Sequence, residues 1–328
     1  MAAEPAQIPV AALDAPLATR LKAVADELRL TVLQVLGQSS FGVLELCEIL
    51  DVRQSGLSHH LKVLARAGWV ETRREGNAIF YRRALPGLDD ALHTALLEQV
   101  DTAPLPAAVA RRLEAVQDRR AQRSRDYFAR LRDGTPGTAR ELIADYPQYA
   151  EVSEQLLRRA QPGGGELAVE IGPGDGRFLA AMAPHYRQLV GYDSAPAMLE
   201  AARNQLAAHG VENVALECGE WPGVAPDEAA ADALVLNMVL HHMPAPADSL
   251  RAAARRLKVG GVMLVTELCE HDQHWAHESC GDLWLGFDEQ ELLAWAARAG
   301  LESLECQYLA QRNGFQVQVR TFVRTGER

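Results

Sequence analysis

A glycine-rich loop between an apolar strand and a helix constrains the fold of this chain more than any other feature. Residues 169–180 read VEIGPGDGRFLA, with Gly172, Gly174 and Gly176 at alternate positions. From residue 166 onward, apolar runs alternate with helical stretches, and the runs are LAVEI, QLVGYD, NVALEC, DALVLNM and GVMLVTEL. Strands that alternate with helices predict a parallel α/β sheet for this part of the chain.

The glycine spacing and two acids indicate what the loop holds. Dinucleotide-binding loops follow G-x-G-x-x-G and meet a pyrophosphate at a helix N-terminus. This loop reads G-x-G-x-G and follows Glu170, whose carboxylate suits an amino group. The next apolar run ends at Asp193, placed to accept hydrogen bonds from two ribose hydroxyls. We therefore expect the loop to bind a ligand that carries an amino group and a ribose. The ligand need not carry a pyrophosphate or another anion.

The front of the chain has the pattern of a winged helix-turn-helix. Apolar residues recur at helical spacing over 17–36, with a turn near the middle, and VLELCEIL predicts a short helix. The segment SGLSHHLKVLARAG carries one apolar stripe, formed by Leu57, Leu61 and Leu64. The segment WVETRREGNAIFYRR alternates with a two-residue period around a Gly-Asn pair, which predicts a β-hairpin.

The charge distribution favours DNA binding by this front segment. The net charge is −11, and residues 161–328 account for it with 12 Lys+Arg against 23 Asp+Glu. Residues 51–85 hold seven basic and three acidic groups. In a winged helix the third helix enters the major groove and the wing contacts phosphate. We predict contacts to base edges and phosphates from Gln54, Ser55, Ser58, His59, Lys62, Arg73, Arg74 and Arg82, with His60 packed or at a phosphate.

The stretch ELCEILDVRQSGLSHHLKVLARAGWVETRREGNAIFYR resembles the ArsR family of winged-helix repressors. The Q-S-x-x-S-x-H-L-x-x-L pattern at 54–64 and the A-G-W-V entry to the wing carry this likeness. The resemblance implies a homodimer that binds a palindromic operator in double-stranded DNA and is released by a ligand. Metalloid-sensing members use paired thiols in the helix before the recognition helix. Here that helix offers only Cys47, so we do not expect it to sense metal.

The blocks VEIGPGDG, GYDSAPAMLEAA, CGEWP, LVLNMVLHHM and LKVGGVMLVTE, in that order, resemble class I S-adenosylmethionine-dependent methyltransferases. The likeness is greatest to small-molecule enzymes of quinone biosynthesis, and it implies a Rossmann-like α/β sandwich. The resemblance implies that S-adenosylmethionine or S-adenosylhomocysteine is bound by Glu170, Gly172, Gly174 and Gly176 at the methionine part, Asp193 at the ribose, Met198, Glu220 and Trp221 at the adenine, and Asn237 and Met238 at the sulfonium.

The sequence leaves open whether the bound molecule is consumed. His241 and His242 follow the fourth predicted strand and are the candidate catalytic bases, although capping of a helix explains them equally well. Another histidine-rich segment, EHDQHWAHESC, has a three-residue spacing that drifts about 60° per step around a helix. We interpret its His271, His274, His277 and Cys280 as part of a polar lid and assign no metal ligands, with a metal shared by His274 and His277 as the alternative. Tyr127 and Phe128 either close over the cofactor or pack in the core.

The predicted organisation is α/β overall, with a flexible arm (1–16), a mostly α winged helix-turn-helix domain (17–86), a helical dimerisation or linker segment (87–160) and a methyltransferase-like domain (161–328). A chain with both modules resembles ArsR regulators fused to a methyltransferase-like domain. That resemblance implies a regulator that senses S-adenosylmethionine or S-adenosylhomocysteine, and we expect it to repress methionine and methyl-cycle genes. The alternative is an active methyltransferase with a small-molecule acceptor and an attached regulatory DNA-binding domain.

The composition predicts a cytoplasmic protein without membrane contact. No apolar run approaches the roughly 18 residues that a membrane-spanning helix needs. The five cysteines are odd in number and scattered, which suits reduced thiols.

Overall fold

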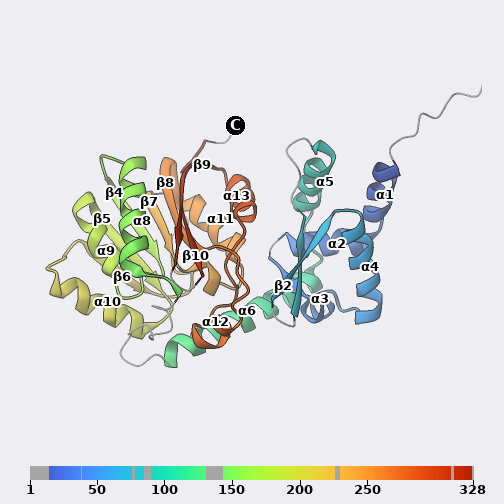
Figure 1. The fold of residues 1–328 in the computed structure, drawn as a ribbon, viewed down its shortest axis with the longest axis horizontal. Helices are drawn as coiled ribbons and strands as arrows, with labels where there is room; N and C mark the ends of the chain where they lie inside the picture. The colour runs from blue at the N-terminus through green and yellow to red at the C-terminus, as the bar shows by residue number, and fades with distance from the viewer. Residues whose placement is uncertain are drawn as a thin grey trace, which may run out of the picture. The chain divides into compact units, whose positions relative to one another are not determined.

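The computed structural model describes residues 15–37, 39–75, 78–84, 90–130, 143–225, 230–311 and 314–326 (Figure 1). The chain divides into two compact units, with the boundary between Val116 and Gln117. The first unit is mostly helical and the second is built on a large sheet, which confirms the predicted fold class. The finer domain boundaries proposed from the sequence stay predictions.

The first unit is a winged helix-turn-helix. Its helices are α1 (Ala15–Val24), α2 (Glu27–Leu36), α3 (Val43–Leu50), α4 (Gln54–Arg66), α5 (Ala91–Thr102) and the first part of α6 (Ala107–Arg130). Its antiparallel sheet places β3 (Ala78–Arg83) between β1 (Phe41–Gly42) and β2 (Val70–Glu75). The predicted turn within 17–36 is confirmed, because Asp26 caps α2 by accepting a hydrogen bond from the Arg29 amide. The α4 helix begins at Gln54, and Arg53 is its N-cap residue.

The core of this unit forms because the apolar stripe of α4 turns inward. Leu57, Leu61 and Leu64 are completely buried in one cluster with the side chains of α2, α3 and Trp69. The Trp69 indole donates a hydrogen bond to the Arg20 carbonyl (3.0 Å), which satisfies its buried N–H. Burial of the stripe leaves the opposite side of α4 free for solvent or a ligand.

A seven-stranded sheet organises the second unit, in the order β6-β5-β4-β7-β8-β10-β9. Its strands are β4 (Gly165–Ile171), β5 (Tyr186–Asp193), β6 (Val214–Cys218), β7 (Ala231–Asn237), β8 (Leu257–Leu268), β9 (Leu301–Ala310) and β10 (Gln316–Arg324). All neighbours from β6 to β8 pair parallel, whereas β10 is antiparallel to both β8 and β9. The strand order reverses beside β4. In open α/β sheets, ligands bind at the carboxyl ends of the strands at such a switch point.

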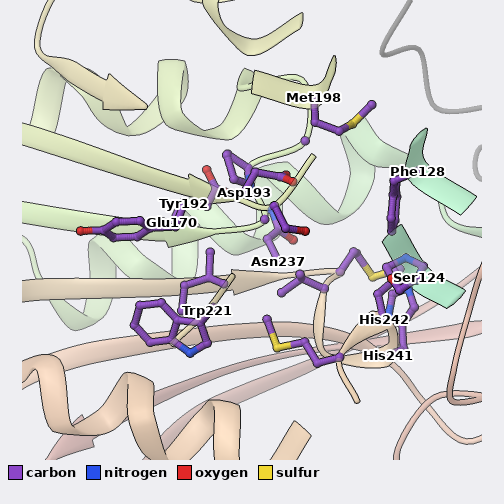
Figure 2. A pocket seen from close by; sticks show the side chains of 18 of the residues that line it. Ser124, Phe128, Glu170, Tyr192, Asp193, Met198, Trp221, Asn237, His241 and His242 are labelled. Carbon is purple, nitrogen blue, oxygen red and sulfur yellow. The ribbon is translucent and has the colours of Figure 1, made fainter. Parts of the chain in front are cut away.

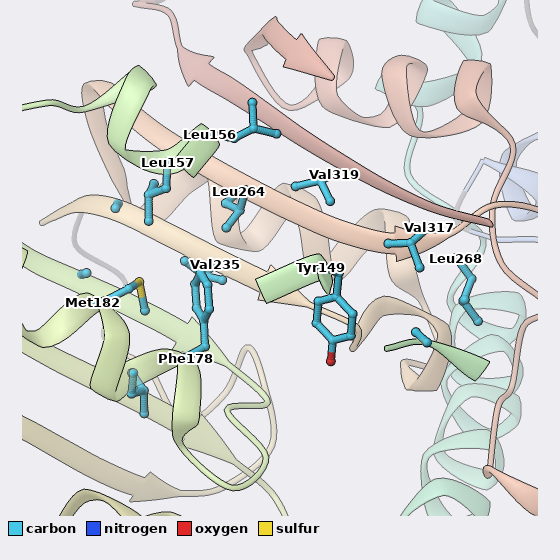
Figure 3. Close-up of a cluster of buried hydrophobic side chains, with 14 of the residues drawn as sticks. Tyr149, Leu156, Leu157, Phe178, Met182, Val235, Leu264, Leu268, Val317 and Val319 are labelled. Carbon is cyan, nitrogen blue, oxygen red and sulfur yellow. The ribbon is translucent and has the colours of Figure 1, made fainter. Parts of the chain in front are cut away.

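Helices cover both faces of this sheet. They are α8 (Tyr146–Ala160), α9 (Arg177–Met182), α10 (Pro196–Ala208), α11 (Pro246–Arg256), α12 (Trp275–Ser279) and α13 (Glu289–Arg298), with 3-10 turns η2 (Ala183–His185) and η3 (Leu240–His242). Figure 3 shows side chains of α8 and α9 against alternate residues of β7, β8 and β10. The residues between these, such as Leu234 and Met263, point to the other face, where α11 contacts β7 and β8. No helix among the described residues is both long and apolar enough to span a membrane.

Candidate functional site

The glycine loop after β4 comes close to two neighbouring segments. Gly172 has a φ of +67°, and a Cβ there would lie 2.5 Å from Cγ2 of Val239. A Cβ at Gly176 would lie 3.0 Å from the Cβ of Ala202 on α10. Gly172 therefore lets the loop pass close to the segment that follows β7, and Gly176 lets the start of α9 pack against α10.

Glu170, the penultimate residue of β4, is the most unusual group at this loop. It is 1% exposed, and its Oε2 has no hydrogen-bond partner among the described residues. Burial, assisted by the nearby Asp175 carboxylate, raises the pKa of Glu170 well above its usual value. A buried acceptor without a partner is costly, so the carboxylate has a strong preference for a cationic donor. An ammonium group of a ligand would meet this preference.

A cavity of about 550 Å³ lies beyond the carboxyl ends of β4, β5 and β7 (Figure 2). This volume is typical of a small-molecule site. Nine predicted ligand residues line it, namely Glu170, Gly172, Gly174, Asp193, Met198, Glu220, Trp221, Asn237 and Met238. The tenth, Gly176, does not line the cavity, because it supports helix packing behind the loop. The predicted catalytic residues His241 and His242 also line it.

One part of the cavity combines a carboxylate with aromatic surface. Asp193 Oδ1 accepts a hydrogen bond from the Ala195 amide (2.8 Å), which fixes the carboxylate at the start of α10. The Trp221 indole donates to the Ser249 carbonyl (3.1 Å), and the Arg256 guanidinium lies 4.9 Å from its ring centre. These contacts hold the ring of Trp221 rigidly. A fixed carboxylate beside a fixed aromatic ring suits a ribose and a base.

The C-terminal part of α6 also lines the cavity. Ser124, Arg125 and Phe128 lie along it, and the Phe128 ring is edge-on to His242 with 5.0 Å between ring centres. Arg125 forms an ion pair with Glu220. In the sequence, the adjacent Tyr127 and Phe128 were the signal for this wall. Of the two, only Phe128 lines the cavity, because the Tyr127 hydroxyl donates a hydrogen bond to the Ser279 carbonyl (2.8 Å).

Sequence reasoning missed another wall of the cavity, formed by Tyr146, Tyr149 and Arg177. The Arg177 guanidinium lies 3.8 Å from the centre of the Tyr146 ring. Burial raises the pKa of the Tyr146 hydroxyl, so it stays protonated and can donate a hydrogen bond. No local pattern indicated Tyr146 and Tyr149, because α8 reads as an ordinary amphipathic helix, and Arg177 lies at the start of α9.

The two predicted catalytic histidines belong to a buried cluster with carboxylates. His241 Nδ1 lies 2.8 and 2.9 Å from the oxygens of Glu267 on β8, and the His241 amide also donates to Glu267. Asp282 Oδ1 lies 3.8 Å from Nε2 of His241 and 3.8 Å from Nδ1 of His242. The sequence offered a base or a helix cap for this pair and did not indicate either carboxylate.

Among the described residues, the other histidine-rich segment does not bring together three or more metal-ligating side chains. His274 is exposed, and His271 Nδ1 accepts from the Gln273 amide (3.2 Å). His277 Nδ1 lies 2.6 Å from the Asp282 carbonyl, so this side chain braces the backbone beside the histidine cluster.

In the first unit, α4 presents the polar residues that the sequence selected for DNA. Gln54, Ser55, His59 and Lys62 are exposed, and Ser58 is half-buried. His60 packs toward α2, with its Nδ1 3.6 Å from Asp26.

The hairpin arginines are less uniform than predicted. Arg73 is 5% exposed, because the two-residue period of β2 turns it to the face opposite Thr72. In this conformation Arg73 is therefore not available to a phosphate. Arg82 is half-buried and pairs with Glu71 (3.2 Å), and the Arg74 side chain lies outside the described residues.

Comparison with known proteins agrees with both units. Residues 142–318 match the methyltransferase domain family and residues 24–73 a helix-turn-helix domain family. The chain is 44% identical over 81 residues to the biofilm growth-associated repressor of Agrobacterium fabrum (24% of this chain, 69% of that one). It is 36% identical over 76 residues to the arsenical resistance operon repressor of Staphylococcus aureus (23% and 73%). Other relatives are covered less, with 56% of a Vibrio cholerae transcriptional activator and 41% of an uncharacterized methyltransferase of Emericella nidulans.

A solved structure supports the fold of the second unit. The 1,6-didemethyltoxoflavin-N1-methyltransferase of Burkholderia thailandensis superposes with a TM-score of 0.51 at 21% identity, over 68% of this chain and 93% of that one. The chain therefore belongs to the methyltransferase domain family through its C-terminal part and carries an ArsR-type helix-turn-helix domain of transcriptional regulators at its N-terminus.

Proposed function

We propose that this chain is a DNA-binding transcriptional regulator whose C-terminal domain senses S-adenosylmethionine or S-adenosylhomocysteine. The observation that carries the proposal is Glu170, a fully buried carboxylate without a described partner for Oε2, at a glycine loop on the wall of a cavity. Both candidate ligands have an amino group that would neutralise this carboxylate. Both also carry an adenosine, for which Asp193 and Trp221 provide a hydrogen-bond acceptor and a ring surface.

The remaining cavity residues fit the same ligand. Asp193 would accept from the ribose hydroxyls, while Met198 and Trp221 would enclose the adenine and Glu220 would accept from its amino edge. Asn237 and Met238 would border the sulfur. The Asn237 Oδ1 has no hydrogen-bond partner among the described residues, so it too is available to a polar group of the ligand.

Helix α6 supplies a route from ligand to DNA. Its first part contributes Val109, Leu113 and Val116 to the core of the winged-helix unit, and its last part lines the cavity through Ser124 and Phe128. A ligand that shifts the end of α6 therefore acts on a helix that the DNA-binding core also holds. For a tenfold loss of DNA affinity, the ligand must bind the state that does not bind DNA about 1.4 kcal/mol more tightly than the state that does. A ligand that binds both states equally would leave DNA affinity unchanged.

The DNA-binding half is proposed to act as a homodimer on a palindromic operator, with α4 in the major groove. Gln54, Ser55, Ser58 and His59 would read base edges, and Lys62 would contact phosphate. The nature of the ligand suggests that the regulated genes belong to methionine and methyl-cycle metabolism, and that the regulator represses them.

A second function, methyl transfer to a small molecule, is favoured by one observation. Glu267 orients His241 on the cavity wall by hydrogen bonds at Nδ1, which is the arrangement of a general base. Formation of S-adenosylhomocysteine from S-adenosylmethionine with candidate acceptors would support this function. In that case the protein would combine methyl transfer with transcriptional regulation through its DNA-binding domain.

Calorimetric titration of the full-length protein with each ligand, alone and bound to its promoter DNA, tests the sensor proposal. We expect ligand affinity to differ between free and DNA-bound protein, and Asp193→Ala to lose the response. Glu200→Ala, an exposed residue of α10 that pairs with Arg203, is the matched control and should keep it. Full response in Asp193→Ala, or identical affinities with and without DNA, would exclude sensing through this site.

A further inference from the structure

The buried histidine cluster has features that ligand sensing does not require. His241, His242 and Asp282 are at most 6% exposed, and Glu267 is completely buried. One ligand atom from each of His241, His242 and Asp282 lies within 4.8 Å of the others. The three residues line the cavity, so the cluster borders the space in which a small molecule would bind.

The hydrogen bonds of His241 determine which of its nitrogens faces Asp282 as an acceptor. A neutral imidazole carries one N–H, and the Glu267 carboxylate at 2.8 Å requires this hydrogen on Nδ1. Nε2 then presents a lone pair, and the atom 3.8 Å away is a carboxylate oxygen of Asp282. A nitrogen lone pair and a carboxylate oxygen at this separation in a buried site are both groups that coordinate a cation.

The spacing of the donors suits a metal ion. Bond lengths of about 2.0–2.2 Å to nitrogen and oxygen place the ligand atoms of a tetrahedral ion about 3.3–3.6 Å apart. Asp282 Oδ1 lies 3.8 Å from Nε2 of His241 and from Nδ1 of His242, a few tenths of an ångström beyond this spacing, and one ligand atom from each of the three residues lies within 4.8 Å of the others. His242 Nδ1 also lies 3.2 Å from the Gly281 carbonyl, so coordination through this nitrogen requires the tautomer that carries its hydrogen on Nε2.

We propose that His241, His242 and Asp282 bind a divalent transition-metal ion of the zinc class, with Glu267 as the positioning residue that orients His241. Two imidazoles and one carboxylate are a donor set that zinc and related ions prefer. A carboxylate hydrogen-bonded to the distal nitrogen of a histidine ligand is the usual support of such sites. Three protein ligands leave coordination positions toward the cavity for an oxygen or nitrogen group of a bound molecule.

Hydrogen bonds to backbone groups hold this cluster in place. The amides of Leu283 and Trp284 donate to the His241 carbonyl (2.9 and 3.1 Å), and His277 braces the Asp282 carbonyl. These bonds fix the loop that carries Asp282 against η3. The site does not depend on the proposed S-adenosyl ligand, since no ligand residue of that proposal belongs to the donor set.

The test is titration of chelator-treated full-length protein with Zn²⁺ alone, against a competing chelator, together with the Co²⁺ absorption spectrum. We expect one ion per chain. Asp282→Asn should weaken binding at least about tenfold, and Glu267→Gln by roughly 10- to 100-fold. His274→Ala, which removes an exposed histidine outside the cluster, should bind as the wild type does. The Co²⁺ form should show ligand-field bands without a thiolate charge-transfer band.

Three results would overturn the proposal: no stoichiometric binding by the wild type, wild-type affinity in folded Asp282→Asn, or a thiolate band that assigns the ion to a cysteine such as the exposed Cys218. Circular dichroism reports whether each variant is folded. If Asp282→Asn is unfolded, His242→Gln replaces it with the same expectation.

Discussion

Replacement of Glu170 by glutamine should make the ligand-free protein more stable and at the same time weaken ligand binding. The glutamate is completely buried, and burial raises its pKa above that of an unfolded chain. A carboxyl whose folded pKa is raised binds more protons in the folded than in the unfolded state. Stability is therefore lost as pH rises from the unfolded pKa through the folded pKa. Glutamine keeps the shape and removes this loss.

The magnitudes follow from the environment of the carboxylate. Glutamine cannot ionise, and each unit by which burial raises the pKa of Glu170 corresponds to about 1.4 kcal/mol of stability lost at neutral pH, so the variant should gain at least about 1 kcal/mol and about 2–4 °C in melting temperature for a unit of this size. A hydrogen bond between charged groups contributes about 1.5–3 kcal/mol, so the variant should bind an amino-bearing ligand roughly 10- to 150-fold more weakly.

The assay is differential scanning calorimetry of both proteins without ligand across pH, followed by titration with S-adenosylhomocysteine. Wild-type affinity should increase with pH, because an ammonium ligand selects the ionised carboxylate. This dependence should be absent in Glu170→Gln. A variant that is less stable than the wild type at neutral pH, or that binds the ligand equally well, would refute the reasoning.

Further changes test other parts of the structure. Lys62→Ala should weaken binding to all DNA sequences and lower the slope of log binding constant against log salt concentration by about 1. Gln54→Ala should instead relax sequence preference and cost about 1–3 kcal/mol of binding free energy at the specific site. Electrophoretic titration at several salt concentrations separates the two, and equal effects of both variants would contradict the assigned roles. Gly172→Ala places a Cβ 2.5 Å from Val239 at a positive φ, so we expect a loss of about 1–3 kcal/mol in thermal unfolding, and an unchanged melting temperature would count against this packing. Arg83→Leu removes a buried guanidinium that donates to the Leu33 carbonyl and to Asp101 (2.9 and 2.5 Å). The Arg83→Leu variant should lose about 1–3 kcal/mol of winged-helix unfolding free energy in chemical denaturation. The control Arg82→Leu, at a half-buried position, should lose less.

Features encoded over short distances could be predicted from the amino-acid sequence. A window of about ten residues displays the apolar stripe of α4 and the two-residue period of β2 and β3. It also displays the break in helical spacing that marks the turn between α1 and α2. The glycine loop was readable for the same reason, because a strand, three glycines and a following helix are contiguous. The position of Asp193 followed from a general rule, since parallel strands end at one edge of a sheet.

Contacts between residues that are far apart in the sequence could not be predicted in this way. Glu267 lies on β8 and Asp282 on a loop after α12, and their approach to His241 depends on how the sheet places three separate segments. Sequence spacing carries no signal for such a meeting, so no pattern indicated that these side chains lie together. The same holds for Arg73, whose charge suggested a phosphate contact until the strand period and the packing of the hairpin turned it inward. Burial and convergence depend on the packing of whole elements, and a local pattern contains neither.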